Sequence, residues 1–281
     1  MNEHGGGALV LSIFPGIGIL DRAFEEQGFT IVRGPDLLWG GDVRRFHPPA
    51  GRFEGVLGGP PCQAHSSLVP LIRARGGTVA PDLIPEFERI VGEAQPAWFL
   101  MENTKRAPLP KVPGYEVHGP MFDNRWIGGE QQRPHRFSFG TRDGRRLDFG
   151  AEDRCLDNPA WARRVMASGG YTPRVLVGGN GSPKRDAAEK VIRKGTGGRL
   201  PRSPQAKSST RSSAAYFAEA KRLQGLPADF DLPGFTAEAK IRVLGDAVPL
   251  PMGRALARAV LRALGRPQLS QGQEDDHVPL R

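Results

Sequence analysis

Residues 8–28 read ALVLSIFPGIGILDRAFEEQG, and this stretch decides the fold. An apolar run over 8–14 ends in the tight sequence PGIG at 15–18, and an amphipathic stretch follows over 19–27 before Gly28. This order predicts a strand, a glycine turn and a helix, because the apolar spacing changes from that of a buried strand to that of a helix. Small residues at the turn let a backbone approach a nucleotide, but the third glycine of the dinucleotide fingerprint is missing, which disfavours a nicotinamide cofactor.

The same alternation continues along the chain. Further strands are expected over Phe29–Val32, Phe53–Leu57 and Ala97–Met101, with a helix over Leu83–Ala94. Strands that alternate with helices predict an α/β fold, here a Rossmann-like, doubly wound and mostly parallel sheet. Two more helices are expected over 214–223 and 251–264, and the second carries an apolar face.

A change of composition divides the chain. From about residue 150 to residue 213, Gly, Ser, Pro, Lys and Arg dominate and regular periodicity largely disappears. This segment could be a simple flexible loop, but its place between two ordered blocks favours a small irregular lobe with basic loops. We therefore expect a main domain in two parts, 8–149 and 214–265, with the lobe at 150–213 and a disordered tail at 266–281.

Size and charge narrow the classes of partner. The chain has 281 residues, of which 38% are hydrophobic, and this is enough for a full α/β core and a smaller lobe. Its net charge is +9 and its pI is about 10.1, so nucleic acid is the first partner to consider. Basic charge alone is weak support, because many soluble proteins are mildly basic.

The chain has two cysteines, Cys62 and Cys155, and their number bears on the redox state of the cellular compartment. One pair in a chain of this length is no disulfide framework and fits a reducing cytoplasm. The N-terminus has no basic stretch followed by an apolar run, and no later segment reaches the roughly 18 apolar residues that a membrane span requires. The sequence therefore predicts a cytoplasmic protein with no membrane partner.

The sharpest feature is the loop GGPPCQ at 58–63, directly after an expected strand. Two glycines and two prolines make a rigid loop that can hold the Cys62 thiol at the carboxyl edge of a parallel sheet, where such folds place their ligands. The alternative is a buried structural cysteine, the commoner fate of a free thiol, but the composition of the loop argues against it.

Glu102 follows the next expected strand, so it should face the same cleft as Cys62. A carboxylic acid beside a thiolate suits addition to a ring, because Cys62 can attack an electrophilic carbon while Glu102 protonates or hydrogen-bonds a ring nitrogen. As an isolated residue, Glu102 would more often be a cap or a loop charge. Asp36 follows the second strand, where a carboxylate can bind ribose hydroxyls, and Asp42 precedes the third. Taken separately, each aspartate is more often a solvated loop residue.

Six short blocks occur in order along the chain. They are FPGIG at 14–18, PPCQ at 60–63, EN at 102–103, QQRPHR at 131–136, RLQGLP at 222–227 and GDAVP at 245–249. Together they resemble the conserved blocks of DNA cytosine-C5 methyltransferases over roughly residues 8–264. Any one block could occur by chance, but six in this order are highly specific. The basic lobe also falls where that family keeps its target-recognition region.

This resemblance implies S-adenosylmethionine as the cofactor, with no metal in the site. The residues that it assigns to the cofactor are Phe14 on the adenine, Gly16 and Gly18 at the methionine end, Asp36 on the ribose, Asp42 on the adenine amine, and further Pro60, Ala247 and Val248. It also implies that Cys62 adds to C6 of a cytosine flipped out of double-stranded DNA, while Glu102 binds the N3 and N4 edge. C5 then takes the methyl group, and loss of the C5 proton expels the cysteine.

The arginine block fits the family pattern in two registers. The pattern supplies two arginines, and the second helps to hold the cytosine O2 and the neighbouring glutamate. Arg133 is the first, and the second place falls to His135 or, after a one-residue bulge, to Arg136. We favour Arg136, because a guanidinium stays charged at any working pH.

The sequence departs from the family pattern at four places. His65 stands where Phe is common, Thr104 where Val is usual and Asp246 where Asn is usual, and the short spacing over 36–42 leaves no room for the usual helix. The expected partner is double-stranded DNA, bound by a monomer from a bacterium or a phage. The recognised site and the existence of a cognate restriction endonuclease stay open. Two rival interpretations are a tRNA cytosine-C5 methyltransferase and a catalytically silent DNA-binding protein of the same fold.

Overall fold

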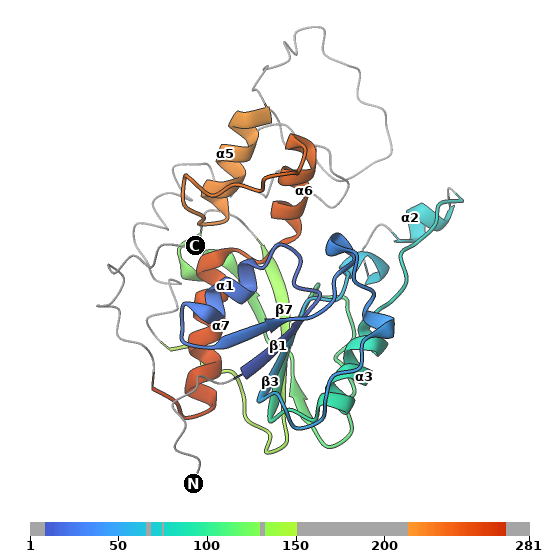
Figure 1. The fold of residues 1–281 in the computed structure, drawn as a ribbon, viewed down its shortest axis with the longest axis vertical. Coiled ribbons are helices and arrows are strands. Elements are labelled where there is room, and N and C mark those ends of the chain that lie inside the picture. The colour runs from blue at the N-terminus through green and yellow to red at the C-terminus, as the bar shows by residue number, and fades with distance from the viewer. Residues whose placement is uncertain (1–8, 66–68, 75, 130–132, 151–212, 268–281) are drawn as a thin grey trace, which may run out of the picture.

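The computed structural model describes residues 9–65, 69–74, 76–129, 133–150 and 213–267 (Figure 1). The basic lobe and the disordered tail expected from the sequence lie almost wholly outside these ranges, as does Cys155. The division into domains therefore stays a prediction. Among the described helices, none has the length and apolar character needed to cross a membrane.

A seven-stranded sheet forms the centre of the molecule, in the order β2-β1-β3-β4-β7-β5, with β6 paired to β7. The strands are β1 (Leu9–Ile13), β2 (Thr30–Arg33), β3 (Gly55–Gly58), β4 (Trp98–Asn103), β5 (Glu116–His118), β6 (Met121–Asp123) and β7 (Pro134–Thr141). The first four are parallel, and β7 runs antiparallel to β4. The predicted fold class is confirmed, whereas the three antiparallel strands β5 to β7 were not predicted.

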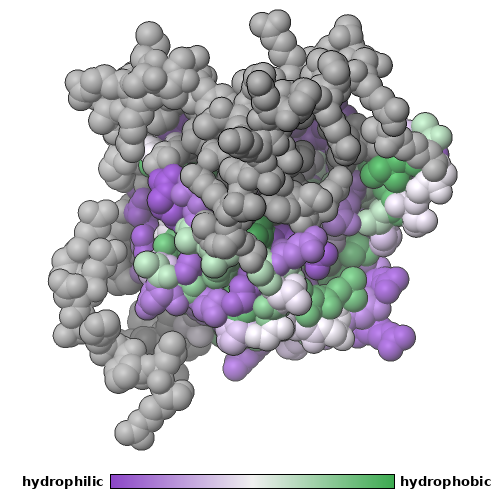
Figure 2. All heavy atoms as spheres, turned by 90° about the horizontal axis from the view of Figure 1, so that it is seen from above, coloured by the Kyte–Doolittle hydropathy of each residue, from purple (hydrophilic) through white to green (hydrophobic). Residues whose placement is uncertain are grey.

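Helices cover both faces of this sheet, as a doubly wound fold requires. On one face lie α1 (Ile19–Glu25) and α7 (Leu250–Ala263), and on the other lies α3 (Ile84–Ala94) (Figure 1). Three further helices are α2 (Val69–Ala74), α5 (Ser213–Leu223) and α6 (Ala237–Asp246). The segment around α2 projects from the body of the molecule, and viewed from above it shows hydrophobic and hydrophilic residues side by side (Figure 2).

The core beneath α1 and α7 is built around Trp98 of β4. Its ring packs against Phe29 at 5.9 Å between centroids and against Phe24 at 6.4 Å. Gly55 lies opposite Trp98 in the β3–β4 register, and a Cβ at Gly55 would come within 2.2 Å of the indole. The large aromatic residue in one strand therefore requires glycine in the next. The side chains that α7 adds to this core include Met252, Leu256 and Val260, which are fully buried.

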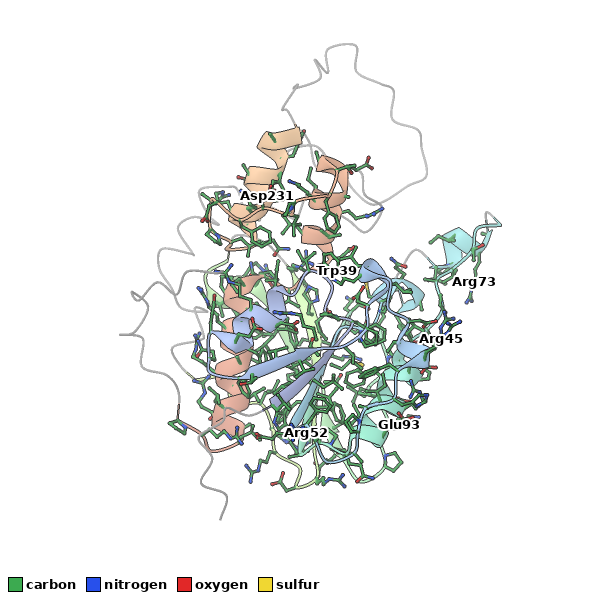
Figure 3. All side chains as sticks on the ribbon, viewed as in Figure 1. Trp39, Arg45, Arg52, Arg73, Glu93 and Asp231 are labelled. Carbon is green, nitrogen blue, oxygen red and sulfur yellow. The ribbon has the colours of Figure 1, made fainter. Side chains whose placement is uncertain are left out.

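The connection from β2 to β3 contains no α-helix, as its short spacing predicted. Two 3₁₀ turns, η1 (Leu37–Trp39) and η2 (Val43–Arg45), take its place. Arg89 holds this connection to α3 by donating hydrogen bonds to the carbonyl oxygens of Val43 and Phe46, each at 3.1 Å. Arg45 and Glu93 mark this side of the molecule in Figure 3.

Candidate active site

The ends of β3 and β4 bring Cys62 and Glu102 together. Cys62 opens the 3₁₀ turn η3 (Cys62–His65), immediately after the two prolines that follow β3. The buried Asn103 side chain donates to the Pro60 carbonyl oxygen at 3.0 Å, which ties this loop to the end of β4. A Cβ at Gly59 would lie 3.3 Å from Oε2 of Glu102, so the carboxyl group faces the loop that carries the cysteine.

Cys62 is a free and exposed thiol, so it is not a buried structural cysteine. Partial desolvation within the site raises the pKa of this thiol, and the negative charges of Glu102 and Asp246 raise it further. Arg133 acts in the opposite direction but does not offset these effects. At neutral pH the side chain is therefore held as a thiol more firmly than an ordinary cysteine.

Arg133 joins the site to a distant part of the chain. Its guanidinium Nη2 donates to the carbonyl oxygens of Gly245 and Ala247, and the second of these bonds measures 2.9 Å. Its Nε donates to Nε2 of His135 at 3.0 Å. Burial lowers the pKa of Arg133, although the carboxylates of Glu102 and Asp246 oppose that shift. The block GDAVP is thus attached to the arginine block through partly buried hydrogen bonds.

His135, and not Arg136, lies beside Glu102, so our preferred register is wrong. Nδ1 of His135 forms a hydrogen bond with Oε1 of Glu102. Arg136 instead donates to the carbonyl oxygens of Ala107 and Lys105. The physical reason is the alternation of side chains along a strand. β7 pairs with β4 without interruption over these residues, and Glu102 lies opposite Phe137. His135 is two positions from Phe137, so its side chain lies on the same face of the sheet as Phe137 and Glu102. Arg136, one position from Phe137, points to the opposite face.

Asp36 organises the glycine turn after β1. Its carboxylate accepts hydrogen bonds from the backbone amides of Gly16 at 2.9 Å and Leu38 at 2.7 Å. Phe14 has a positive φ of 56°, a strained conformation of the kind that gathers at functional sites. A Cβ at Gly16 would meet no atom within 4 Å, so open space lies beside this turn.

An aromatic side chain that sequence reasoning missed borders the same space. The Trp39 indole Nε1 donates to the Gly16 carbonyl oxygen at 2.7 Å, and the ring packs edge-on against Phe235 at 5.7 Å between centroids. Trp39 is nevertheless 60% exposed and Leu37 is 67% exposed. Figure 3 shows Trp39 between the sheet and α6. Large apolar side chains left open beside a glycine turn suit the binding of a flat ring such as adenine.

Asp42 forms its hydrogen bonds within its own turn, with Arg44. It caps η2, and its carboxylate receives hydrogen bonds from the backbone amide and the guanidinium of Arg44, at 3.1 Å and 2.9 Å respectively. The Arg44 guanidinium holds the pKa of Asp42 below its ordinary value. Its expected contact with the adenine amine therefore stays a prediction.

The block RLQGLP holds the block GDAVP in place. The Gln224 side chain is buried, and its amide donates to the carbonyl oxygens of Leu244 and Ala247, while its backbone oxygen accepts from Leu250 at 2.9 Å. Val248 lies in the core. Five of the six sequence blocks therefore meet through contacts between residues that are far apart in the chain.

Three comparisons with known proteins point to one family and one fold. Residues 41–155 match the family of C-5 cytosine-specific DNA methylases. The type II methyltransferase M.HgiDI of Herpetosiphon aurantiacus is 26% identical, over 93% of this chain and 96% of that protein. M.HgiGI, from the same organism, is 42% identical over 36% of this chain and 94% of that protein. The structure of the Entamoeba histolytica methyltransferase EhMeth superposes with a TM-score of 0.54 at 12% identity, over 92% of this chain and 99% of that one.

These comparisons carry different weight. At 12% identity, the likeness to EhMeth concerns the fold alone. The sequence relatives reach further, because M.HgiGI is matched over almost its whole length. The chain belongs to the C-5 cytosine-specific DNA methylase family and is a DNA cytosine-5 methyltransferase.

Proposed function

We propose that this enzyme transfers a methyl group from S-adenosylmethionine to C5 of a cytosine flipped out of double-stranded DNA, with Cys62 as the nucleophile and Glu102 as its partner on the ring. Family membership already implies methylation of DNA that depends on S-adenosylmethionine. The observation that carries the finer proposal is the exposed Cys62 thiol on a loop that Asn103 ties to the end of β4, beside the Glu102 carboxyl group.

The chain's own groups account for the order of events. The Cys62 sulfur, after losing its proton, forms a bond to C6 while Glu102 donates a hydrogen bond or a proton to ring N3. Electron density then rises at C5. The cofactor, when bound, would supply the electrophilic methyl group that C5 takes up, and S-adenosylhomocysteine would leave with the electron pair of the broken sulfur–methyl bond. Loss of the C5 proton returns an electron pair to the ring and breaks the carbon–sulfur bond. Arg133 holds the surrounding loops in position through Gly245 and Ala247.

The cofactor would bind beside the glycine turn, where the residues present fit its parts. Asp36 offers carboxylate lone pairs to ribose hydroxyls, and the exposed ring of Trp39 offers an apolar surface to adenine. Gly16 leaves open space at the turn. Phe14, Gly18, Pro60, Ala247 and Val248 remain candidate contacts from the sequence.

Asp36→Ala and Phe14→Ala should each weaken cofactor binding. The first removes the acceptor for two backbone amides and for the ribose, and the second removes an apolar contact, so we expect losses of about 1 to 3 kcal/mol each. Calorimetric titration with S-adenosylmethionine measures the affinity. Asp229→Ala, at an exposed aspartate, is the matched control and should bind normally. Unchanged affinity in both test variants would show that the cofactor binds elsewhere.

Alkylation of Cys62 should respond to its neighbouring charges. Because partial desolvation and two carboxylates raise the thiol's pKa, its reaction with iodoacetamide should rise with pH along a curve displaced to higher pH than that of an ordinary cysteine. Glu102→Gln removes a negative charge and should move this curve to lower pH, so the reaction at a fixed pH becomes faster. The measurement uses a Cys155→Ser background, with Glu116→Gln as control. If the alkylation curve of Glu102→Gln coincides with that of the wild type, the proposed proximity of Glu102 to the Cys62 thiol is contradicted.

Bisulfite sequencing tests the reaction and its substrate together. Plasmid DNA from cells that express the enzyme should contain cytosines resistant to conversion at one recurring sequence, and cells that express Cys62→Ala should lack them. The tRNA of the same cells provides the second arm. Protected cytosines in tRNA, together with fully converted plasmid DNA, would favour the rival substrate and overturn the proposal.

A further inference from the structure

The side chains of Arg133, His135 and Glu102 form a chain of hydrogen bonds. Arg133 Nε donates to His135 Nε2 at 3.0 Å, and His135 Nδ1 contacts Glu102 Oε1. The His135 and Glu102 side chains are only 13% and 15% exposed. Both ring nitrogens of the histidine are therefore engaged in a partly buried setting.

The direction of these bonds fixes the protonation state of the imidazole. An arginine N–H can only donate, so Nε2 of His135 must be the acceptor and cannot carry a proton. Nδ1 then carries the single proton and donates a hydrogen bond to Oε1 of the Glu102 carboxyl group. An imidazolium would instead direct a second N–H, and a second positive charge, at the Arg133 guanidinium. His135 is accordingly the neutral Nδ1–H tautomer.

The surroundings make this arrangement rigid. The Arg133 guanidinium is also bonded to the carbonyl oxygens of Gly245 and Ala247, which keeps its Nε directed at His135. The other titratable groups that act on the arginine are Asp246 and Cys62. On β7, the Phe137 ring lies 6.2 Å from the imidazole between centroids. The backbone register between β7 and β4 sets the position of His135 along the strand relative to Glu102.

The geometry points to His135 as the positioning residue of Glu102: held by Arg133 as the neutral Nδ1–H tautomer, it binds Oε1 and leaves Oε2 for the target base. Oε2 is the oxygen that faces Gly59 and hence the loop of Cys62. The place that the family resemblance assigns to one arginine is thus shared between two residues. A neutral imidazole fixes the orientation of the carboxyl group without adding a positive charge next to it. This inference rests on the role proposed for Glu102.

The tautomer can be observed in the free enzyme, without any turnover. Long-range ¹H–¹⁵N correlation NMR on protein labelled at histidine nitrogen should show, for His135, a protonated Nδ1 and an unprotonated Nε2 at neutral pH. His135→Gln assigns the signals by their disappearance. A protonated Nε2, alone or together with Nδ1, would overturn the inference. Because this readout needs neither DNA nor methyl transfer, it stands or falls separately from the proposed function.

Two substitutions then separate positioning from simple packing. An asparagine amide nitrogen can take the place of Nδ1, whereas a glutamine amide reaches the place of Nε2. We therefore expect His135→Asn to keep kcat within about tenfold of wild type, and His135→Gln and His135→Ala to lose about 100-fold, with little change in KM for DNA. His118→Asn and His118→Gln are the matched controls on β5. Equal losses in His135→Asn and His135→Gln, measured on folded protein, would contradict a role through Nδ1.

Discussion

Cys62→Ala is expected to abolish methyl transfer while leaving the fold and part of the DNA affinity intact. The thiol is exposed, so its removal costs little packing, whereas the alanine side chain has no group that can form the bond to C6. Removal of a nucleophile commonly lowers kcat by at least about 10⁴-fold. Transfer of a labelled methyl group to DNA measures the loss, and thermal unfolding of both proteins shows whether the fold is retained.

DNA that contains 5-fluorocytosine tests the same role of Cys62 by trapping the covalent complex. Fluorine at C5 replaces the proton whose loss would release the enzyme, so the wild-type protein should remain covalently attached through Cys62. The complex should survive denaturing electrophoresis. Cys155→Ser should form it normally and Cys62→Ala should not form it. Methyl transfer by the alanine variant at the wild-type rate would exclude the mechanism.

Glu102→Gln should produce the second largest loss. The amide has nearly the same shape as the carboxyl group, and its oxygen can still accept from His135, but it cannot transfer a proton to ring N3. Loss of a general acid typically costs about 10² to 10⁴-fold in kcat, and cofactor affinity should change little. Single-turnover methylation at saturating DNA measures the chemical step directly.

The control for this variant is Glu116→Gln on β5, an exposed glutamate that should tolerate the change. Formation of the covalent complex should slow in Glu102→Gln along with turnover, because the acid assists the addition step itself. If Glu102→Gln instead turns over within a few fold of wild type, the acid must be another group, and the proposed pairing with the base fails.

The sequence predicted the parts of the fold in which apolar residues recur at a regular spacing. The segment that became β1 and α1 changes its apolar spacing at a glycine turn, and the cysteine loop follows a fully buried strand. Strands β5 and β6 escaped prediction because each has only three residues, too few to show alternation. Helix α6 was also missed.

The error at His135 and Arg136 has a different origin. The chemical preference for a permanent charge decided the register, while the strand that contains both residues was not recognised. Once β7 begins at Pro134, alternation alone directs His135 toward Glu102. Trp39 was missed, and the contacts of Gln224 were not predicted, because their hydrogen-bond partners lie some 20 positions away in the chain. Single-sequence patterns do not report such contacts.

The position of α7 on the sheet has a consequence for how the enzyme is made. Glu26 at the end of α1 binds Arg254 of α7, although 228 positions separate them. Ribosomal synthesis delivers β1 first, yet the side chains that cover its neighbours on this face arrive with Met252, Leu256 and Val260. A nascent chain therefore carries this face of its core uncovered until α7 has been synthesised. Competence to modify the genome then depends on α7, so we expect a message interrupted before α7 to yield no partly active enzyme.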